Sequence, residues 1–167
     1  MAKFFGYFAG AGFVVALLVH LAALFGLDFI GATPAVFALH VLMFVPFIPC
    51  AIAMNKQFGR RMKLREIAAI LPKWAVRTMI LLMIYASLNF ILFIRATDGG
   101  SPSERDGQLV LQQKGTLIRV LNEAEYRAYK TNEIRGMSGH WLIFYFMPFA
   151  YFRFGRKQEA PSQSNAA

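Results

Sequence analysis

Polar residues that interrupt long apolar segments are the positions of this chain where chemistry is most expected. His20, His40 and Asn89 lie inside such segments, and His140 stands at the start of another. Polar side chains are costly inside a bilayer and by default mark a functional site there. The candidate cofactor-binding residues of the sequence are therefore His20, His40, Asn89 and His140.

The spacing of these residues predicts a common depth if the apolar segments are membrane helices. His20 lies seven residues before the end of the first segment, and His40 lies seven residues after the start of the second. At about 1.5 Å per residue, the two histidines would lie roughly 10 Å inside the outer boundary. Asn89 falls at a similar depth in the third segment. Facing each other across neighbouring helices, His20 and His40 could ligate a haem b, bind a metal or hydrogen-bond a quinone.

The competing interpretation gives the same residues a structural role, with neither a cofactor nor a metal. His20, His40 and Asn89 could hydrogen-bond each other or backbone carbonyls and so hold the helices together. Volume distinguishes the two hypotheses, because a haem needs a slot lined by small residues. The candidates for that slot on the first helix are Gly12, Ala16 and Ala23.

The sequence lacks the motifs of known catalytic schemes, which favours a non-enzymatic protein. It contains no His-Glu-x-x-His, no Gly-x-Ser-x-Gly and no phosphate-binding loop. Ser138-Gly139-His140 resembles the core of lipid phosphatases of the phosphatidic-acid phosphatase type. The resemblance stops there, because no Arg-Pro dipeptide and no later histidine accompany it. The apolar segments also hold no acidic residue for a proton or substrate path, which disfavours transport.

Composition indicates a membrane protein. The chain is 57% hydrophobic and 16% charged, whereas soluble domains average about 45–50% and about 25%. The apolar residues gather in the segments 4–27, 33–54, 74–94 and 140–154. A stretch of about 20 apolar residues can span a bilayer as a helix. The last segment is short and aromatic, and an interfacial or re-entrant course is the alternative to the span that we expect for it.

The connection between the second and third segments, residues 55–73, is strongly basic. Within it, residues 60–71 place apolar side chains at helical spacing, which predicts a short amphipathic helix lying on the membrane. Its basic side chains would reach lipid headgroups. The residues expected to contact anionic headgroups are Lys56, Arg60, Arg61, Lys63, Arg65 and Lys73.

The polar segment 96–138 predicts a small β-β-α insertion between the third and fourth helices. Lys114-Gly115 separates two strand-like runs and predicts a hairpin turn. Asn122 and Glu125 form a capping signal for a helix over residues 123–135, and Gly136 is placed to end it. A lone hairpin is marginal in water, so we expect the insertion to pack on the membrane helices or on a partner.

The distribution of Lys and Arg predicts that both termini lie in the cytoplasm. Short loops rich in basic residues stay inside, and the loop 55–73 and both termini are basic. The segment 96–138 then faces outward, although it carries six basic residues mixed with acidic ones. The net charge of +9 indicates contact with lipid headgroups rather than nucleic acid, since no nucleic-acid-binding motif is present.

The sequence therefore predicts an all-α integral membrane protein, a four-transmembrane-helix bundle with a small extracytoplasmic β-hairpin plus helix insertion. Its expected parts are helices one to three with the basic loop (1–95), the insertion (96–138), the fourth helix (139–155) and a disordered cytoplasmic tail (156–167). We expect a multi-pass protein of the bacterial inner membrane with a non-catalytic accessory, assembly or interaction role. It would act on a membrane-protein partner or on a second copy of itself. The alternative is a haem-, metal- or quinone-binding redox protein that uses His20 and His40.

Overall fold

The chain is mostly helical with one small sheet. The computed structural model describes residues 1–27, 29, 33–59, 63–97 and 99–156, so the tail expected over 156–167 lies almost wholly outside the described residues. The helices are α1 (Ala2–Leu24), α2 (Thr33–Leu42), α3 (Phe44–Phe58), α4 (Leu64–Ile70), α5 (Lys73–Ala96) and α6 (Glu123–Phe154). The strands are β1 (Ser101–Arg105), β2 (Gln108–Gln113) and β3 (Thr116–Val120).

Within the described residues, three helical stretches are long and apolar enough to cross a membrane: Ala2–Leu24, Ala35–Phe58 and Lys73–Ala96. They correspond to the first three apolar segments of the sequence. The fourth segment, residues 140–154, is the second half of α6 and is not one of these three.

The second apolar segment is divided into α2 and α3 at Met43. Pro46 explains the position of the break. It has no N–H to donate to the carbonyl of Leu42, and its ring crowds that carbonyl. The helix is interrupted directly after Leu42 and resumes at Phe44. The break therefore falls about one turn before Pro46.

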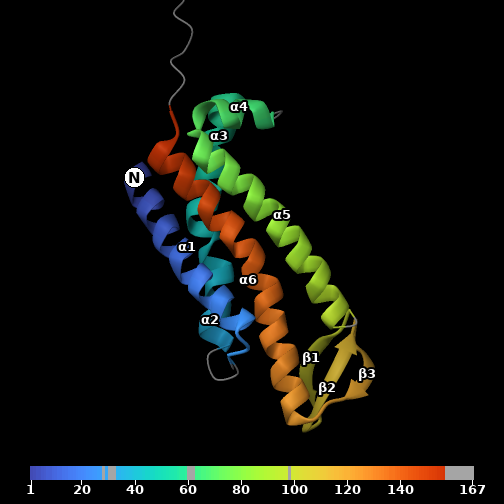
Figure 1. The fold of residues 1–167 in the computed structure, drawn as a ribbon. Helices are drawn as coiled ribbons and strands as arrows, with labels where there is room; N and C mark the ends of the chain where they lie inside the picture. The colour runs from blue at the N-terminus through green and yellow to red at the C-terminus, as the bar shows by residue number, and fades with distance from the viewer. Residues whose placement is uncertain (28, 30–32, 60–62, 98, 157–167) are drawn as a thin grey trace, which may run out of the picture.

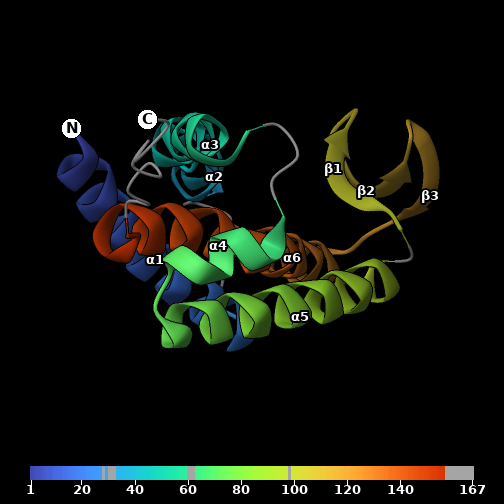
Figure 2. The same ribbon diagram turned by 90° about the horizontal axis from the view of Figure 1, so that it is seen from above.

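Helix α6 runs without interruption for 32 residues through the centre of the bundle. It lies between α5 on one side and α2 and α3 on the other, with α1 alongside (Figures 1 and 2). The helix expected to end at Gly136 therefore does not end there. A Cβ at Gly136 would lie 2.5 Å from the ring of Phe93. Gly136 thus serves the close approach of α5 rather than the termination of a helix.

The insertion holds three strands rather than the two expected. β1 pairs antiparallel with β2, and β2 with β3, in the order β1-β2-β3. Two-residue turns with positive φ angles join the strands, at Asp106-Gly107 and at Lys114-Gly115. The second turn confirms the predicted hairpin. β1 falls within a segment that contains serines and a proline and has no apolar alternation, so its strand pattern was weak.

The predicted capping signal is confirmed at the start of α6. The backbone N–H of Glu125 donates to Oδ1 of Asn122 at 2.9 Å, and the backbone N–H of Asn122 donates to the Glu125 carboxylate at 3.0 Å. The amphipathic helix expected over 60–71 is shorter, because α4 covers Leu64–Ile70. Positions 60–62 lie outside the described residues.

Small residues on α1 face large ones on α6, and this pairing forms the main core. The buried residues of α1 are Gly6, Ala9, Ala16, His20 and Ala23. Trp141, Leu142 and Tyr145 of α6 pack in the same core cluster as Ala16 and Ala23. Close packing of small against large side chains is the main attraction available to helices in lipid.

The two ends of the bundle differ. The start of α1, the short helix α4 and the end of α6 lie at one end, and the sheet lies at the other, beyond the ends of α5 and α2 (Figure 1). The basic connection 55–73 and the sheet are therefore at opposite ends of the molecule.

Candidate functional site

His20 is a buried polar side chain of the helical bundle. It lies on α1 with 2% of its surface exposed, between α5 and α6. Its Nδ1 lies 2.8 Å from Oγ of Ser138 on α6, and its Nε2 hydrogen-bonds the hydroxyl of Tyr85 on α5. Both ring nitrogens are therefore engaged, and His20 links three helices.

The hydrogen bonds of His20 continue to the backbone of α6. Oγ of Ser138 also lies 3.3 Å from the carbonyl oxygen of Arg135. A neutral imidazole has one donor and one acceptor, so one ring nitrogen of His20 donates and the other accepts. The result is a continuous series of hydrogen bonds from Tyr85 through His20 and Ser138 to Arg135.

Asn89 also contacts the carbonyl of Arg135, at which this series of hydrogen bonds ends. Its side-chain Nδ2 donates to the carbonyl oxygen of Arg135 at 3.0 Å. A Cβ at Gly139 would lie 2.3 Å from that nitrogen, so the glycine leaves the space that Asn89 occupies. Two of the sequence-predicted residues, His20 and Asn89, are thus linked through Ser138 and the carbonyl of Arg135. We name Tyr85, His20, Ser138 and Asn89 the polar chain.

His40 belongs to a second polar group. Its Nδ1 accepts a hydrogen bond from Nε1–H of Trp141 at 2.9 Å. Its ring lies 5.7 Å from that of His140, at a right angle. His40 of α2 and His140 of α6 therefore lie together where these two helices meet. His20 and His40 were expected to face each other, but they hydrogen-bond different residues: His20 contacts Ser138 and Tyr85, and His40 contacts Trp141.

The hydrogen bonds leave these histidines in poor positions to ligate a metal. A ligating imidazole must offer an unshared lone pair, and His40 uses that of Nδ1 to accept from Trp141. Both ring nitrogens of His20 are engaged by hydroxyls, those of Ser138 and Tyr85. Among the described residues, no group of three or more His, Cys, Asp or Glu side chains could hold a metal.

The slot considered for a haem is filled by side chains of α6. A Cβ on Gly12 would lie 2.2 Å from the ring of Tyr145. Ala16 is fully buried and Ala23 is 4% exposed, in one core cluster with Trp141 and Tyr145. Side chains of α6 therefore pack against the small residues of α1. This geometry favours the structural interpretation of His20.

The polar chain includes two residues that the sequence analysis missed as partners, Tyr85 and Ser138. Tyr85 lies four residues before Asn89 and so shares its helix face. Ser138 lies between the two glycines of α6 that face α5. A search for polar residues spaced by four within apolar segments would have found Tyr85 beside Asn89.

The residues expected at lipid headgroups are exposed wherever the structure describes them. Lys56 lies in the last turn of α3, Lys63 and Arg65 lie at the start of α4, and Lys73 is the first residue of α5. All four side chains are exposed at the end of the bundle opposite the sheet. Arg60 and Arg61 lie outside the described residues.

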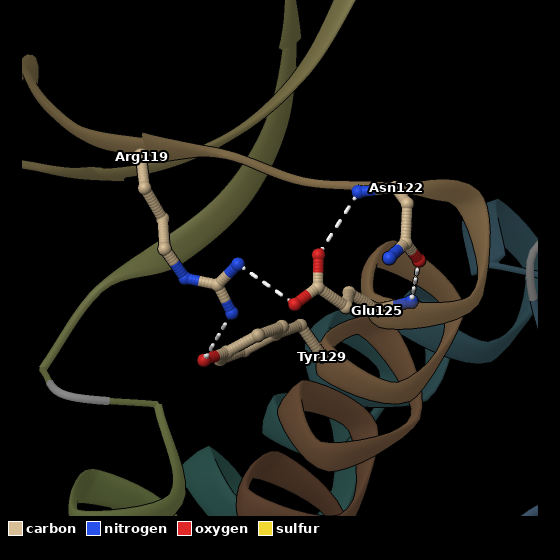
Figure 3. Close-up of polar contacts among 4 residues, drawn as sticks. All are labelled: Arg119, Asn122, Glu125 and Tyr129. Carbon is tan, nitrogen blue, oxygen red and sulfur yellow. Dashed lines mark hydrogen bonds and ion pairs between the residues drawn. The ribbon is translucent and has the colours of Figure 1, made fainter.

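At the other end, a polar network fastens the sheet to α6. Arg119 of β3 donates to the Glu125 carboxylate at 2.8 Å and to the hydroxyl of Tyr129 at 3.4 Å (Figure 3). The backbone N–H of Asn122, then the guanidinium of Arg119, lower the pKa of Glu125 below its ordinary value. The same carboxylate therefore caps the helix and holds the edge strand.

The chain matches no protein-family model, no curated protein and no solved structure.

Proposed function

We propose that this chain is a multi-pass protein of the bacterial inner membrane with a non-catalytic accessory or interaction role. Its four spans are α1, the α2–α3 pair, α5 and the second half of α6. Both termini lie in the cytoplasm, and the sheet lies on the opposite side, where it binds an extended segment of another membrane-associated protein. Its other contact is with anionic lipid, and nucleic acid is not a partner.

The orientation is supported by the placement of charge. The exposed residues Lys56, Lys63, Arg65 and Lys73 gather at the end that also holds the start of α1 and the end of α6. Short basic loops stay on the cytoplasmic side. The fourth span is supported by burial: Trp141, Tyr145 and Ala150 of α6 are each at most 1% exposed. A short apolar segment needs less contact with lipid when neighbouring helices cover it.

The observation that carries the interaction role is the exposed edge of β3. All five residues of this strand are exposed. Leu117, Ile118 and Val120 are 49%, 43% and 53% exposed. The other edge strand, β1, carries Pro102, Glu104 and Arg105, which are residues that protect a sheet edge from further pairing. The β3 edge lacks this protection, since its one charge, Arg119, is held by α6.

The edge of β3 suits the addition of a strand from a partner. An extended peptide can pair with a free sheet edge through main-chain hydrogen bonds, and side-chain contacts then give selectivity. The register between β2 and β3 shifts between Leu111 and Gln112, which leaves Ile118 as the extra residue of a bulge. Bulges at a sheet edge re-aim side chains. The Arg119–Glu125 pair keeps the strand in place before any partner arrives.

Site-specific photocrosslinking in living cells tests this proposal. A photoreactive phenylalanine analogue replaces Ile118 in one variant and Glu104, on the opposite edge, in the matched control. We expect a defined protein adduct from position 118 and none from position 104. Val120→Pro, combined with the crosslinker at 118, should abolish the adduct. An adduct that forms equally from both edges, or none from position 118, would refute the interaction role of this edge.

A further inference from the structure

Helix α4 crosses α6 beside α5 (Figure 2). Side chains of these helices line a lateral groove there. Its volume is about 560 Å³, within the range of about 300–1,000 Å³ found for small-molecule sites. Its walls are apolar side chains of α4, α5 and α6, among them Ile67, Leu71, Met79, Met83, Phe144 and Met147. Among the residues that the structure describes, Arg65 is the one charged residue of the lining.

The groove exists because only one end of α4 is packed. Ile70 and Leu71 are buried in a cluster with Phe146 and Ala150 of α6. At the other end of the short helix, Leu64 is 79% exposed although it is apolar. The first turn of α4 therefore stands away from α5 and α6. The gap beneath it opens to the side, where Met83 is half exposed.

We infer that this groove binds one acyl chain of an anionic phospholipid, with the phosphate of the headgroup at Arg65. The inference rests on the membrane location proposed above and adds a specific lipid site to it. Three methionines line the groove, at positions 79, 83 and 147, and methionine adapts to flexible apolar ligands. Val76 to Met83 of α5 extend the groove over seven residues, about 10 Å.

The charge around the mouth selects an anionic headgroup. Arg65 is exposed, and Lys63 and Lys73 are exposed beside it in the chain. The one acid of α4, Glu66, accepts a hydrogen bond from the backbone N–H of Lys63 at 2.9 Å and so caps the helix.

Native mass spectrometry of the full chain tests the site. The purified protein is exposed in mild detergent to equal amounts of phosphatidylglycerol and phosphatidylcholine with identical acyl chains. One basic contact near a membrane surface corresponds to about a five-fold preference. We expect about that preference for phosphatidylglycerol in the wild type. Arg65→Gln should bring the ratio close to one, whereas Arg77→Gln, an exposed arginine outside the groove, should not.

A substitution that fills the groove tests whether the acyl chain of the lipid lies there. Ala68→Trp places a large ring in the groove, and Ala69→Trp, its exposed neighbour outside the lining, is the matched control. Ala68→Trp should lower the retention of both lipids several-fold. Met83→Trp, which fills the groove from α5, should have the same effect. Retention equal to that of Ala69→Trp in both variants would overturn the inference.

A second readout separates this inference from the proposed location. Membranes from cells that express each variant are washed at high pH and sedimented. Wild-type protein that is lost from the membranes would overturn the location and the lipid site together. Protein that stays in the membranes but shows no lipid preference would overturn the lipid site alone.

Discussion

At the residue scale, His20 has both of its hydrogen-bonding capacities satisfied in an apolar surrounding. Its two ring nitrogens hydrogen-bond the hydroxyls of Ser138 and Tyr85. A buried polar group left without its partner costs about 1–3 kcal/mol. We therefore expect the polar chain to stabilise the contact of α1, α5 and α6, with its hydrogen bonds acting together rather than as independent pairs.

This expectation predicts a non-additive double-mutant cycle. Tyr85→Phe leaves Nε2 of His20 without its partner, and Ser138→Ala leaves Nδ1 without its partner. Each should destabilise the protein by about 1–3 kcal/mol, measured as the fraction folded in detergent against increasing denaturant. The double variant should differ from the sum by about 0.5 kcal/mol or more, because both act through one imidazole.

Two exposed positions supply the controls for this cycle. Tyr7→Phe and Ser87→Ala remove the same hydroxyl groups from exposed sites on α1 and α5. Both should change the free energy of unfolding by less than about 0.5 kcal/mol. Strict additivity of Tyr85→Phe and Ser138→Ala would show that His20 does not connect them.

At the element scale, the attachment of β3 to α6 depends on the charge of Glu125. The pKa of this carboxyl is lowered in the folded protein, first by the backbone N–H of Asn122 and then by Arg119. A lowered carboxyl pKa contributes stability above the ordinary value of about 4.3, and this stability is lost as the pH falls through the folded-state pKa. We therefore expect β3 to loosen from α6 in acid.

Hydrogen exchange measures this loosening. Protection factors of the amides of Arg119 and Val120 should fall as the pH drops below about 4. Glu125→Gln should lower the protection at neutral pH and remove its dependence on acid. Glu104→Gln, on β1, should leave both unchanged. If Glu125→Gln keeps the pH dependence of the wild type, another group holds the strand.

Local signals in the sequence predicted several elements because each has a short-range physical cause. Asn122 and Glu125 satisfy free N–H groups at the start of α6, and Lys114-Gly115 adopts the positive φ angles of a tight turn. Asp106-Gly107 carries the same signal and adopts the same turn. Applying that rule to it would have predicted β1.

The features that the sequence did not predict depend on contacts between distant residues. Gly136 looks like a helix end until Phe93 of α5 is seen against it. The sequence grouped His20 with His40 and Asn89 because their positions along the apolar segments predict a similar depth in the membrane. Which way each side chain points around its helix depends on packing. That packing joined His20 to Asn89 through Arg135 and left His40 with Trp141.

At the scale of the whole molecule, the proposed orientation predicts which surfaces a reagent can reach. Cys50 is buried and is the one cysteine of the chain, so Cys50→Ala gives a background without thiols. In right-side-out vesicles, a membrane-impermeant maleimide should label Glu104→Cys. It should label Ala2→Cys only after the vesicles are opened. Both positions are exposed, so labelling of Ala2→Cys from outside would contradict the orientation.

The continuity of α6 has a mechanical consequence. Its 32 residues form a rod of about 48 Å, longer than the roughly 30 Å hydrocarbon layer. A tilt of about 5° at the sheet would displace the far end by about 4 Å over that length if the helix moved as a rigid body. Pro148 lies near that far end and leaves the carbonyl of Phe144 without its helical donor, so the helix can bend there. A displacement of β3 would therefore be transmitted along α6 as far as Pro148.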